Sequence, residues 1–329
     1  MAGVNVLALL GQFKHSRIAN EQTEILSAKL AEGGVLYKKQ VFFNFLADIP
    51  RIFSIFIPVW LLIKHIDDFN DIDNCDVIVV SGKNMIRYAK HIRKTSFPNA
   101  KIVQIGKTYH RLQKQDILLR QYTSRFIPHY TNTIVYNGLI SKEVNKEIAN
   151  AECNKFIKIR EIFKGNVISV FIDGKRYTYN LTKSEIEEFA KNISIISNNM
   201  KKPLLIYADK NVNKNTISLL KENLDCSYYF YSKRDNPYNN PKVAFIAWGS
   251  SYILIGNSIN NQSEIISQNK PTYVYTTSLN TNRYLRFIEK VKEIGSIKII
   301  DNKTEILEDY VPQKMNEIDK ITEQIKKML

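Results

Sequence analysis

The chain has 329 residues, a hydrophobic fraction of 44%, a charged fraction of 24% and a formal net charge of +15. This composition excludes a disordered chain, and the length exceeds what one hydrophobic core usually supports, so we expect two domains. The three cysteines, Cys75, Cys153 and Cys226, are far apart, odd in number and in no metal-ligand spacing. They exclude a disulfide framework and indicate a reducing, cytoplasmic compartment.

Apolar runs typical of strands alternate with helical patterns along the first half of the chain. Strands are predicted at 4–10, 77–81, 101–105 and 133–137, and helices near 21–31 and 85–94. The apolar tract 41–64 contains Asp48 and Arg51, and each charge costs roughly 2.5–3.5 kcal/mol at a bilayer centre, so a full membrane span is not expected. A buried element of the domain and an interfacial segment remain as alternatives.

After a polar interval at 141–164 the alternation restarts. Strands are predicted at 167–172, 203–207, 227–231, 252–255, 272–275 and 296–300. Helices are predicted near 183–198, 213–222 and 312–329, and a short one is predicted to start near 260 or 261. Such alternation predicts parallel sheets with helices on both faces. We therefore predict an α/β protein with two Rossmann-like, doubly wound parallel-sheet domains facing each other across a cleft. The domains are residues 1–164 and 165–310, and a helix at 311–329 is expected to pack back on the first domain.

The positive charge is concentrated in the first half of the chain. Eleven basic residues and one acid, Asp116, lie between Lys83 and Arg125. A field of this sign suits an anionic partner such as a phosphate, a nucleic acid or an anionic membrane surface. An AT-rich genome, which favours Lys over Arg, is an alternative explanation. Charge alone, without a stacking-aromatic motif, does not predict nucleic-acid binding.

Polar residues follow the predicted strands, where ligands bind in open α/β sheets. After the first strand, His15 is a candidate general base because its unperturbed pKa lies near neutrality, and Gln22 is a second candidate catalytic residue beside it. A histidine at such a place can equally be a bystander. Ser81, Gly82 and Lys83 precede a predicted helix, where they can hold a phosphate or the acceptor. An ordinary helix cap explains them as well.

The stretch from Asn257 to Glu264 gathers small polar side chains around a helix predicted to begin near Asn260 or Asn261. The candidates for a donor-binding role there are Asn257, Ser258, Asn260, Gln262 and Ser263. The N–H groups of a helix start favour an anion such as a diphosphate, and the Glu264 carboxylate has the two oxygens needed to accept from a ribose diol. Plain capping accounts for the same residues.

The block from Asn236 to Pro271 resembles the mitochondrial-fission, elongated-mitochondria-type family. Asn236-Pro237-Tyr238, Ser263-Glu264 and Lys270-Pro271 match its pattern in order and spacing, and weaker similarity extends over most of the chain. The resemblance implies a GT-B-like glycosyltransferase that moves a sugar from a nucleotide-diphosphate donor to a lipid-linked or lipopolysaccharide acceptor. It implies no cofactor, no metal and no nucleic-acid partner. The protein would bind peripherally to an anionic membrane surface, at the inner face of the inner membrane. The donor would be held by Gly174, Lys210, Asn236, Pro237, Tyr238 and the Asn257–Glu264 stretch.

The chain departs from the family pattern at several of these positions. Asp173 stands in place of a glycine, Asp209 and Lys210 replace two arginines, and Asn257 replaces an acid. Arginine and lysine are not interchangeable where a phosphate is held by two hydrogen bonds. The alternative hypothesis is therefore a catalytically degenerate family member that acts as a membrane-associated interaction or scaffold protein.

Overall fold

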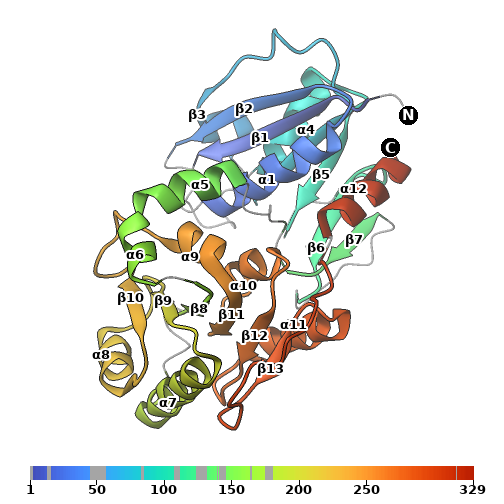
Figure 1. Cartoon of the computed structure of the whole chain (residues 1–329). Coiled ribbons are helices and arrows are strands. Elements are labelled where there is room, and N and C mark those ends of the chain that lie inside the picture. The colour runs from blue at the N-terminus through green and yellow to red at the C-terminus, as the bar shows by residue number, and fades with distance from the viewer. Residues whose placement is uncertain are drawn as a thin grey trace. The chain divides into compact units, whose positions relative to one another are not determined.

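The computed structural model divides the chain into two compact units (Figure 1). Unit 1 comprises residues 1–141 and 316–329, and unit 2 comprises residues 142–315. The described residues are 3–12, 16–44, 57–82, 85–106, 112–123, 132–138, 140, 146–163, 165–174, 181–315 and 317–329.

Unit 1 is built on a seven-stranded sheet with the order β3-β2-β1-β4-β5-β6-β7. All neighbouring strands are parallel except β2 and β3, which are antiparallel. The strands are β1 (Val6–Gln12), β2 (Leu36–Phe43), β3 (Ile63–Ile66), β4 (Val77–Ser81), β5 (Lys101–Ile105), β6 (Ile117–Gln121) and β7 (Thr133–Tyr136). The helices are α1 (Arg17–Leu30), α3 (Val59–Leu62), α4 (Met85–Thr95) and α12 (Glu317–Met328).

Both faces of this sheet are buried, as the continuous apolar strands require. Along β4, Val77 and Val79 pack with α1 and α12, while Ile78 and Val80 pack with α4. The C-terminal helix is fastened by Glu317, whose carboxylate accepts from the Asn137 backbone N–H at 3.0 Å. The chain therefore returns to unit 1 after completing unit 2.

Unit 2 is built on a six-stranded, fully parallel sheet with the order β10-β9-β8-β11-β12-β13. The strands are β8 (Val167–Ile172), β9 (Leu204–Ala208), β10 (Tyr228–Ser232), β11 (Gly249–Ile255), β12 (Thr272–Tyr275) and β13 (Lys298–Ile300). The helices are α5 (Lys146–Lys155), α6 (Ile157–Ile162), α7 (Lys183–Met200), α8 (Lys214–Asn223), α9 (Lys242–Trp248), α10 (Ile259–Ile266) and α11 (Asn282–Ile294).

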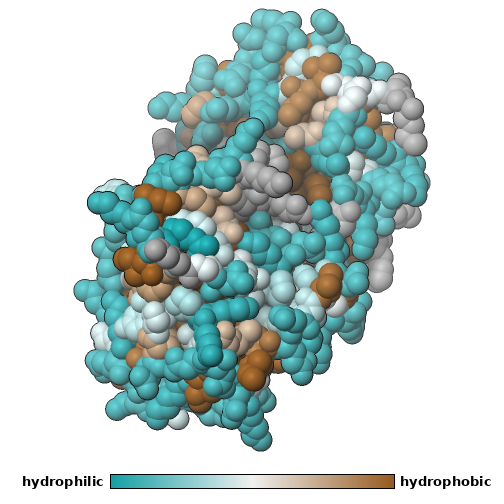
Figure 2. Space-filling model, viewed as in Figure 1, coloured by the Kyte–Doolittle hydropathy of each residue, from teal (hydrophilic) through white to brown (hydrophobic). Residues whose placement is uncertain are grey.

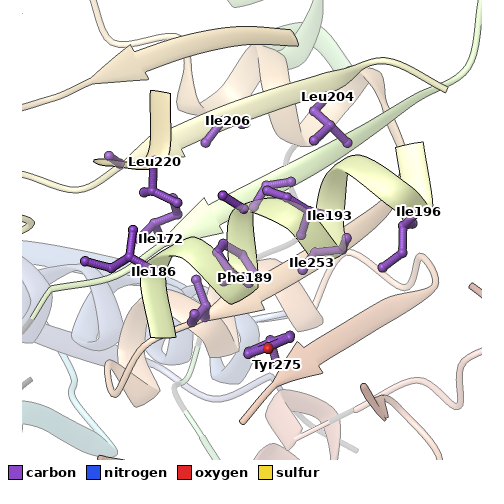
Figure 3. Close-up of a cluster of buried hydrophobic side chains, with 14 of the residues drawn as sticks. Ile172, Ile186, Phe189, Ile193, Ile196, Leu204, Ile206, Leu220, Ile253 and Tyr275 are labelled. Atoms are coloured by element: carbon purple, nitrogen blue, oxygen red, sulfur yellow. The ribbon is translucent and has the colours of Figure 1, made fainter. Parts of the chain in front are cut away.

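Alternate residues of β8 belong to two different cores. Ile168, Val170 and Ile172 pack with α7 and α8, and Figure 3 shows the side chains of α7 directed at this face of the sheet. Val167 and Phe171 face α9, α10 and α11 on the other side. The next odd-numbered residue is Asp173, so the strand's alternation directs its carboxyl group to the α9–α10 side.

The structure confirms the predicted α/β class with two doubly wound parallel-sheet units. The polar interval 141–164 differs from the sequence prediction, which assigned it to the first domain. Residues 142–164 belong to unit 2, because α5 packs against α9. Of the apolar tract 41–64, residues 45–56 lie outside the described residues, and its ends contribute to β2, α3 and β3.

Hydrophilic residues cover most of the face shown in Figure 2, where hydrophobic ones form small separate patches. In the described part of the chain, no helix combines the length and the apolar content that a membrane crossing requires.

Candidate functional site

In the sheet of unit 2, the order in which the chain adds strands reverses at one point. After β8 the chain moves to β9 and β10 on one side, and β11 to β13 lie on the other side of β8. The adjacent strands β8 and β11 therefore form a topological switch point, and their carboxyl ends are the usual place for a ligand. Asp173 and Gly174 follow β8 there, and Gly256 and Asn257 follow β11.

The helix α10 begins at this switch point. Its N-cap is Ser258, whose Oγ accepts from the Asn261 backbone N–H at 3.4 Å. The helix starts at Ile259, slightly earlier than predicted, and half-buried Asn260 lies in its first turn. The first N–H groups of a helix have no acceptor within the helix. The end of α10 therefore offers donors and a positive partial charge at the carboxyl ends of β8 and β11.

Asp173 faces this helix end and is 4% exposed. Its Oδ1 accepts from the Asn261 side-chain amide at 2.8 Å. Its Oδ2 is buried and has no hydrogen-bond partner among the described residues. The pKa of Asp173 is raised to about 7, mainly by burial and also by the Asp209 and Glu264 carboxylates, while Asn261 and Lys242 oppose the shift. This is the kind of perturbed group that gathers at functional sites.

Two glycines allow the main chain to approach closely around Asp173. Gly256 has a φ of +136°, and a Cβ at this position would lie 2.6 Å from the carbonyl oxygen and the Cβ of Asp173. A Cβ on Gly174, a predicted donor-binding residue, would lie 2.4 Å from the carbonyl oxygen of Asn211 in the β9–α8 loop. The strand ends are therefore packed main chain against main chain, which only glycine permits.

Two of the predicted donor-binding side chains fasten α10 and its preceding turn to α11. Asn257 donates to the Leu279 carbonyl at 3.1 Å and accepts from the backbone N–H of Thr281, the N-cap of α11, at 3.2 Å. Gln262 is fully buried, and its Oε1 accepts from the Tyr284 hydroxyl at 2.6 Å. Its Nε2 has no partner in the described part of the chain. These contacts give Asn257 and Gln262 a positioning role in the fold.

Glu264, the predicted ribose-binding acid, already has a partner. Its Oε2 lies 2.7 Å from Nζ of Lys242, the first residue of α9. The neighbouring Ser263 is buried and donates to the Ile259 carbonyl at 2.6 Å, so it acts within the helix. Lys270, part of the family signature, donates to three carbonyls at the end of α9, at 2.8–3.0 Å. The side chain of the lysine in the Lys-Pro pair therefore caps the C-terminal end of α9.

The structure does not bring the remaining predicted donor-binding residues to the same point of unit 2. Asn236, Pro237 and Tyr238 lie in the loop after the edge strand β10, two strands from β8, and Tyr238 is 93% exposed. The Tyr231 hydroxyl donates to the Asn236 carbonyl and ties down this loop. Lys210 is exposed in the loop after β9. Within the described residues, no cluster of His, Cys, Asp and Glu is arranged to hold a metal ion.

Unit 1 has its own switch point, between β1 and β4. Ser81 is buried at the end of β4, and Gly82 follows with a φ of +95°. His15 and Lys83, which flank these strand ends in sequence, lie outside the described residues. Gln22 lies on α1, where its Nε2 donates only weakly to the Ile18 carbonyl, at 3.5 Å, and its Oε1 is buried without a described partner.

Sequence reasoning did not assign a role to three groups that meet at the switch point of unit 2. From the sequence, Asp173 is a departure from the family pattern at the end of a predicted strand and has no assigned role, and Asn261 and Lys242 are not candidates. The position of Asp173 directly after a buried strand was the available signal. Asn261 and Lys242 had none, because their partners lie 88 and 22 residues away in the chain.

Comparison with known families identifies the chain. The family described as "Mitochondrial fission ELM1" matches residues 20–329. The chain belongs to this family. The prediction made from the block between Asn236 and Pro271 is thereby confirmed. An uncharacterized protein of Rickettsia prowazekii is 25% identical over 317 residues, which cover 86% of this chain and 88% of the relative.

Several solved structures are similar to this ELM1-family chain along its length. A glycosyl transferase family 9 protein of Veillonella parvula gives a TM-score of 0.49 at 9% identity, covering 100% of this chain and 98% of the other. MurG of Acinetobacter baumannii gives 0.42 at 8% identity, covering 99% and 93%. WaaG, a glycosyltransferase of lipopolysaccharide biosynthesis, gives 0.36 at 12% identity, covering 99% and 90%.

Proposed function

We propose that this ELM1-family chain is a glycosyltransferase of the GT-B type, with a nucleotide-diphosphate sugar as donor. The observation that supports the proposal most is the switch point of unit 2, where α10 begins between the ends of β8 and β11. A nucleotide diphosphate fits such a place, because helix N–H donors and a positive partial charge face an anion. Transfer of the sugar then leaves a charged diphosphate in a site that stabilises it.

The donor-site roles follow from which groups are free to turn toward a ligand. The first-turn N–H groups of α10, with Ser258 and Asn260, would contact the diphosphate. Lys242 lies 2.7 Å from Glu264 and its charge acts on Asp173, so it would supply a cation to the site. Glu264 would exchange part of this ion pair for the ribose hydroxyls. Gly174 would let the main chain approach the ligand, and Lys210, Asn236, Pro237 and Tyr238 would contact its outer part from the loops after β9 and β10. Asn257, Gln262 and Ser263 would hold α10 in place.

Unit 1 would hold the acceptor. The acceptor we propose is a lipid-linked sugar or lipopolysaccharide at the inner face of the inner membrane, matched by the basic segment 83–125. Ser81, Gly82 and Lys83 would contact its phosphate at the β4 end, near the switch point of the first sheet. His15 would act as the general base on the acceptor hydroxyl, with Gln22 orienting it.

The donor site is tested by thermal denaturation with a panel of UDP-, CDP-, GDP- and ADP-linked sugars. We expect one of them to stabilise the wild type and to stabilise Ser258→Ala and Glu264→Ala much less. Glu293→Ala is the control, because it also breaks an ion pair of unit 2, between Glu293 and Lys290 at 2.9 Å, in the last turn of α11. If no sugar nucleotide stabilises the wild type between about pH 6 and 8.5, or if Glu264→Ala responds like Glu293→Ala, the donor site is wrong.

One observation favours the alternative of a degenerate, membrane-associated scaffold protein. Asp173 puts a carboxyl group at the α10 helix end, where an ionised carboxylate repels a diphosphate. A variant that replaces Asp173 by glycine, and Asp209 and Lys210 by arginine, separates the two functions. Nucleotide binding by the triple variant, together with none by the wild type at any pH, would establish the degenerate alternative.

A further inference from the structure

The buried carboxyl of Asp173 is only half satisfied. Oδ1 accepts from the Asn261 amide at 2.8 Å, in the first turn of α10, while Oδ2 is buried and lacks a partner among the described residues. Buried polar atoms in proteins nearly always have a hydrogen-bond partner. An exception at a topological switch point, on a side chain that is 4% exposed, points to a partner that arrives with the ligand.

The described charges around Asp173 come from three directions. Lys242 faces it from α9, Glu264 from α10, and Asp209 from the end of β9. The turn that leads from β11 into α10 and the first residues of α10, from Gly256 to Ser263, contain no ionisable side chain. Two carboxylates and one lysine therefore surround the group, and Lys242 is already paired with Glu264. This environment favours the neutral form of Asp173 and keeps its pKa near neutrality.

We infer that Asp173 is a ligand-binding residue. In the complex its Oδ2 carries a proton and donates a hydrogen bond to a phosphate oxygen of the sugar nucleotide. A neutral carboxyl group is both donor and acceptor. Oδ1 keeps its bond from Asn261 while Oδ2–H meets the anion at the end of α10. The inference rests on the proposed donor site and explains how that site tolerates an acid. Binding above the pKa of Asp173 then takes up one proton from solvent.

The competing arrangement leaves Asp173 ionised and accepting from a ligand hydroxyl or amine. It predicts that binding strengthens as the pH rises, and that a nucleoside or free sugar without phosphate binds comparably well. The two arrangements therefore give opposite pH dependences, which one series of titrations separates.

The test is isothermal titration calorimetry with the UDP-, CDP-, GDP- and ADP-linked sugars. Their diphosphate diesters keep a constant charge across neutral pH, so a change in Kd with pH reports the titration of a group of the protein. For the wild type we expect constant affinity below about pH 7 and a loss of roughly tenfold per pH unit above it. Titrations in buffers with different ionisation enthalpies should show about one proton taken up at about pH 8.

Two variants make the test specific. Asp173→Asn keeps an acceptor for Asn261 and offers an N–H donor to the phosphate, so its affinity should not vary with pH and should exceed that of the wild type at about pH 8.5 by roughly tenfold or more. Asp209→Asn is the control, because it keeps Asp173: its affinity should still fall as the pH rises, beginning at a somewhat lower pH than in the wild type, since the Asp209 carboxylate no longer raises the pKa of Asp173.

The outcomes separate this inference from the proposed function. If the wild type binds a sugar nucleotide without proton uptake, or binds better as the pH rises, the inference is wrong while the donor site stands. If neither the wild type nor Asp173→Asn binds any sugar nucleotide at any pH, the donor site fails and the inference fails with it. If Asp173→Asn does not fold, the number of protons that the wild type takes up on binding decides whether the inference is right.

Discussion

Asp173→Asn should stabilise unit 2, and the gain should grow as the pH rises. The folded-state pKa of Asp173 is about 7, against an ordinary value of 3.8, so the folded protein holds this proton more tightly than the unfolded chain. The free energy of unfolding is therefore unaffected below the pKa of the unfolded chain. It falls as the pH rises between the two pKa values, and the loss is complete above the pKa of the folded protein. Asparagine has nearly the same shape, keeps the contact to Asn261 and does not titrate.

The size of the effect follows from the shift in pKa. A difference of about three pKa units corresponds to roughly 4 kcal/mol of destabilisation once Asp173 is ionised in both states, above about pH 8. At pH 5 the unfolded chain has already released this proton and the folded protein has not, so the cost there is only about 2 kcal/mol. The advantage of the variant should therefore grow by roughly 2–3 kcal/mol between pH 5 and 8, or roughly 5–10 °C in Tm.

Tryptophan fluorescence can report the unfolding of unit 2 alone. The chain has two tryptophans, Trp60 in unit 1 and Trp248 in unit 2, so the background substitution Trp60→Phe leaves Trp248 as the reporter. Comparing melts of this background with and without Asp173→Asn at matched pH cancels the titration of all other groups. A difference in Tm that is constant from pH 5 to 8.5, or that shrinks, would refute the assignment of the raised pKa to Asp173.

Three further substitutions test the surroundings of the site. Lys270→Met should cost about 3 kcal/mol in urea unfolding, because three partly buried carbonyls at the end of α9 lose a charged donor. Equal midpoints for Lys270→Met and the wild type would contradict that role. Gly256→Ala should lower the free energy of unfolding by at least about 2 kcal/mol, since the new Cβ would clash with the main chain of Asp173 at a positive φ. An unchanged free energy of unfolding would mean that the turn relaxes to accommodate the Cβ. Glu264→Gln breaks a partly exposed pair with Lys242 and should change stability by less than about 1 kcal/mol, so any loss of nucleotide-induced stabilisation in that variant reports on binding.

The regular strands of both sheets were predictable because their apolar runs are continuous. Val77–Ser81, Lys101–Ile105 and Val167–Ile172 have the predicted bounds. The pattern fails where a strand carries charge. In β2, Lys39 interrupts the apolar residues yet is buried, because Asp71 pairs with it at 2.5 Å from a distant part of the chain. No local pattern reveals such a partner, so β2 was not predicted.

The candidate site was predictable in position but not in the roles of its residues. The strand ends and the helix start at Ser258 follow from periodicity and capping preferences. Capping, fastening a neighbouring helix and binding an anion all require the same small polar side chains, so sequence cannot separate them. Asn257 is engaged with the start of α11, and Ser263 with its own helix. Residues that match the family signature can therefore hold the site without touching a ligand.

Within the proposed donor site, the acid at position 173 has a use that it lacks in a scaffold protein. An unpartnered, buried carboxyl lowers the stability of the unliganded protein at neutral pH, and asparagine at the same position would remove that cost. A scaffold protein gains nothing from the acid, whereas a protein that binds a phosphate gains a donor that is present only while the carboxyl is protonated, a pH control that asparagine cannot give. Both effects arise from one titration of the free folded protein. The pH at which the Tm difference levels off and the pH at which the affinity begins to fall must therefore agree within about one unit. If they differ by more, another group controls the binding, and Asp173 governs stability alone.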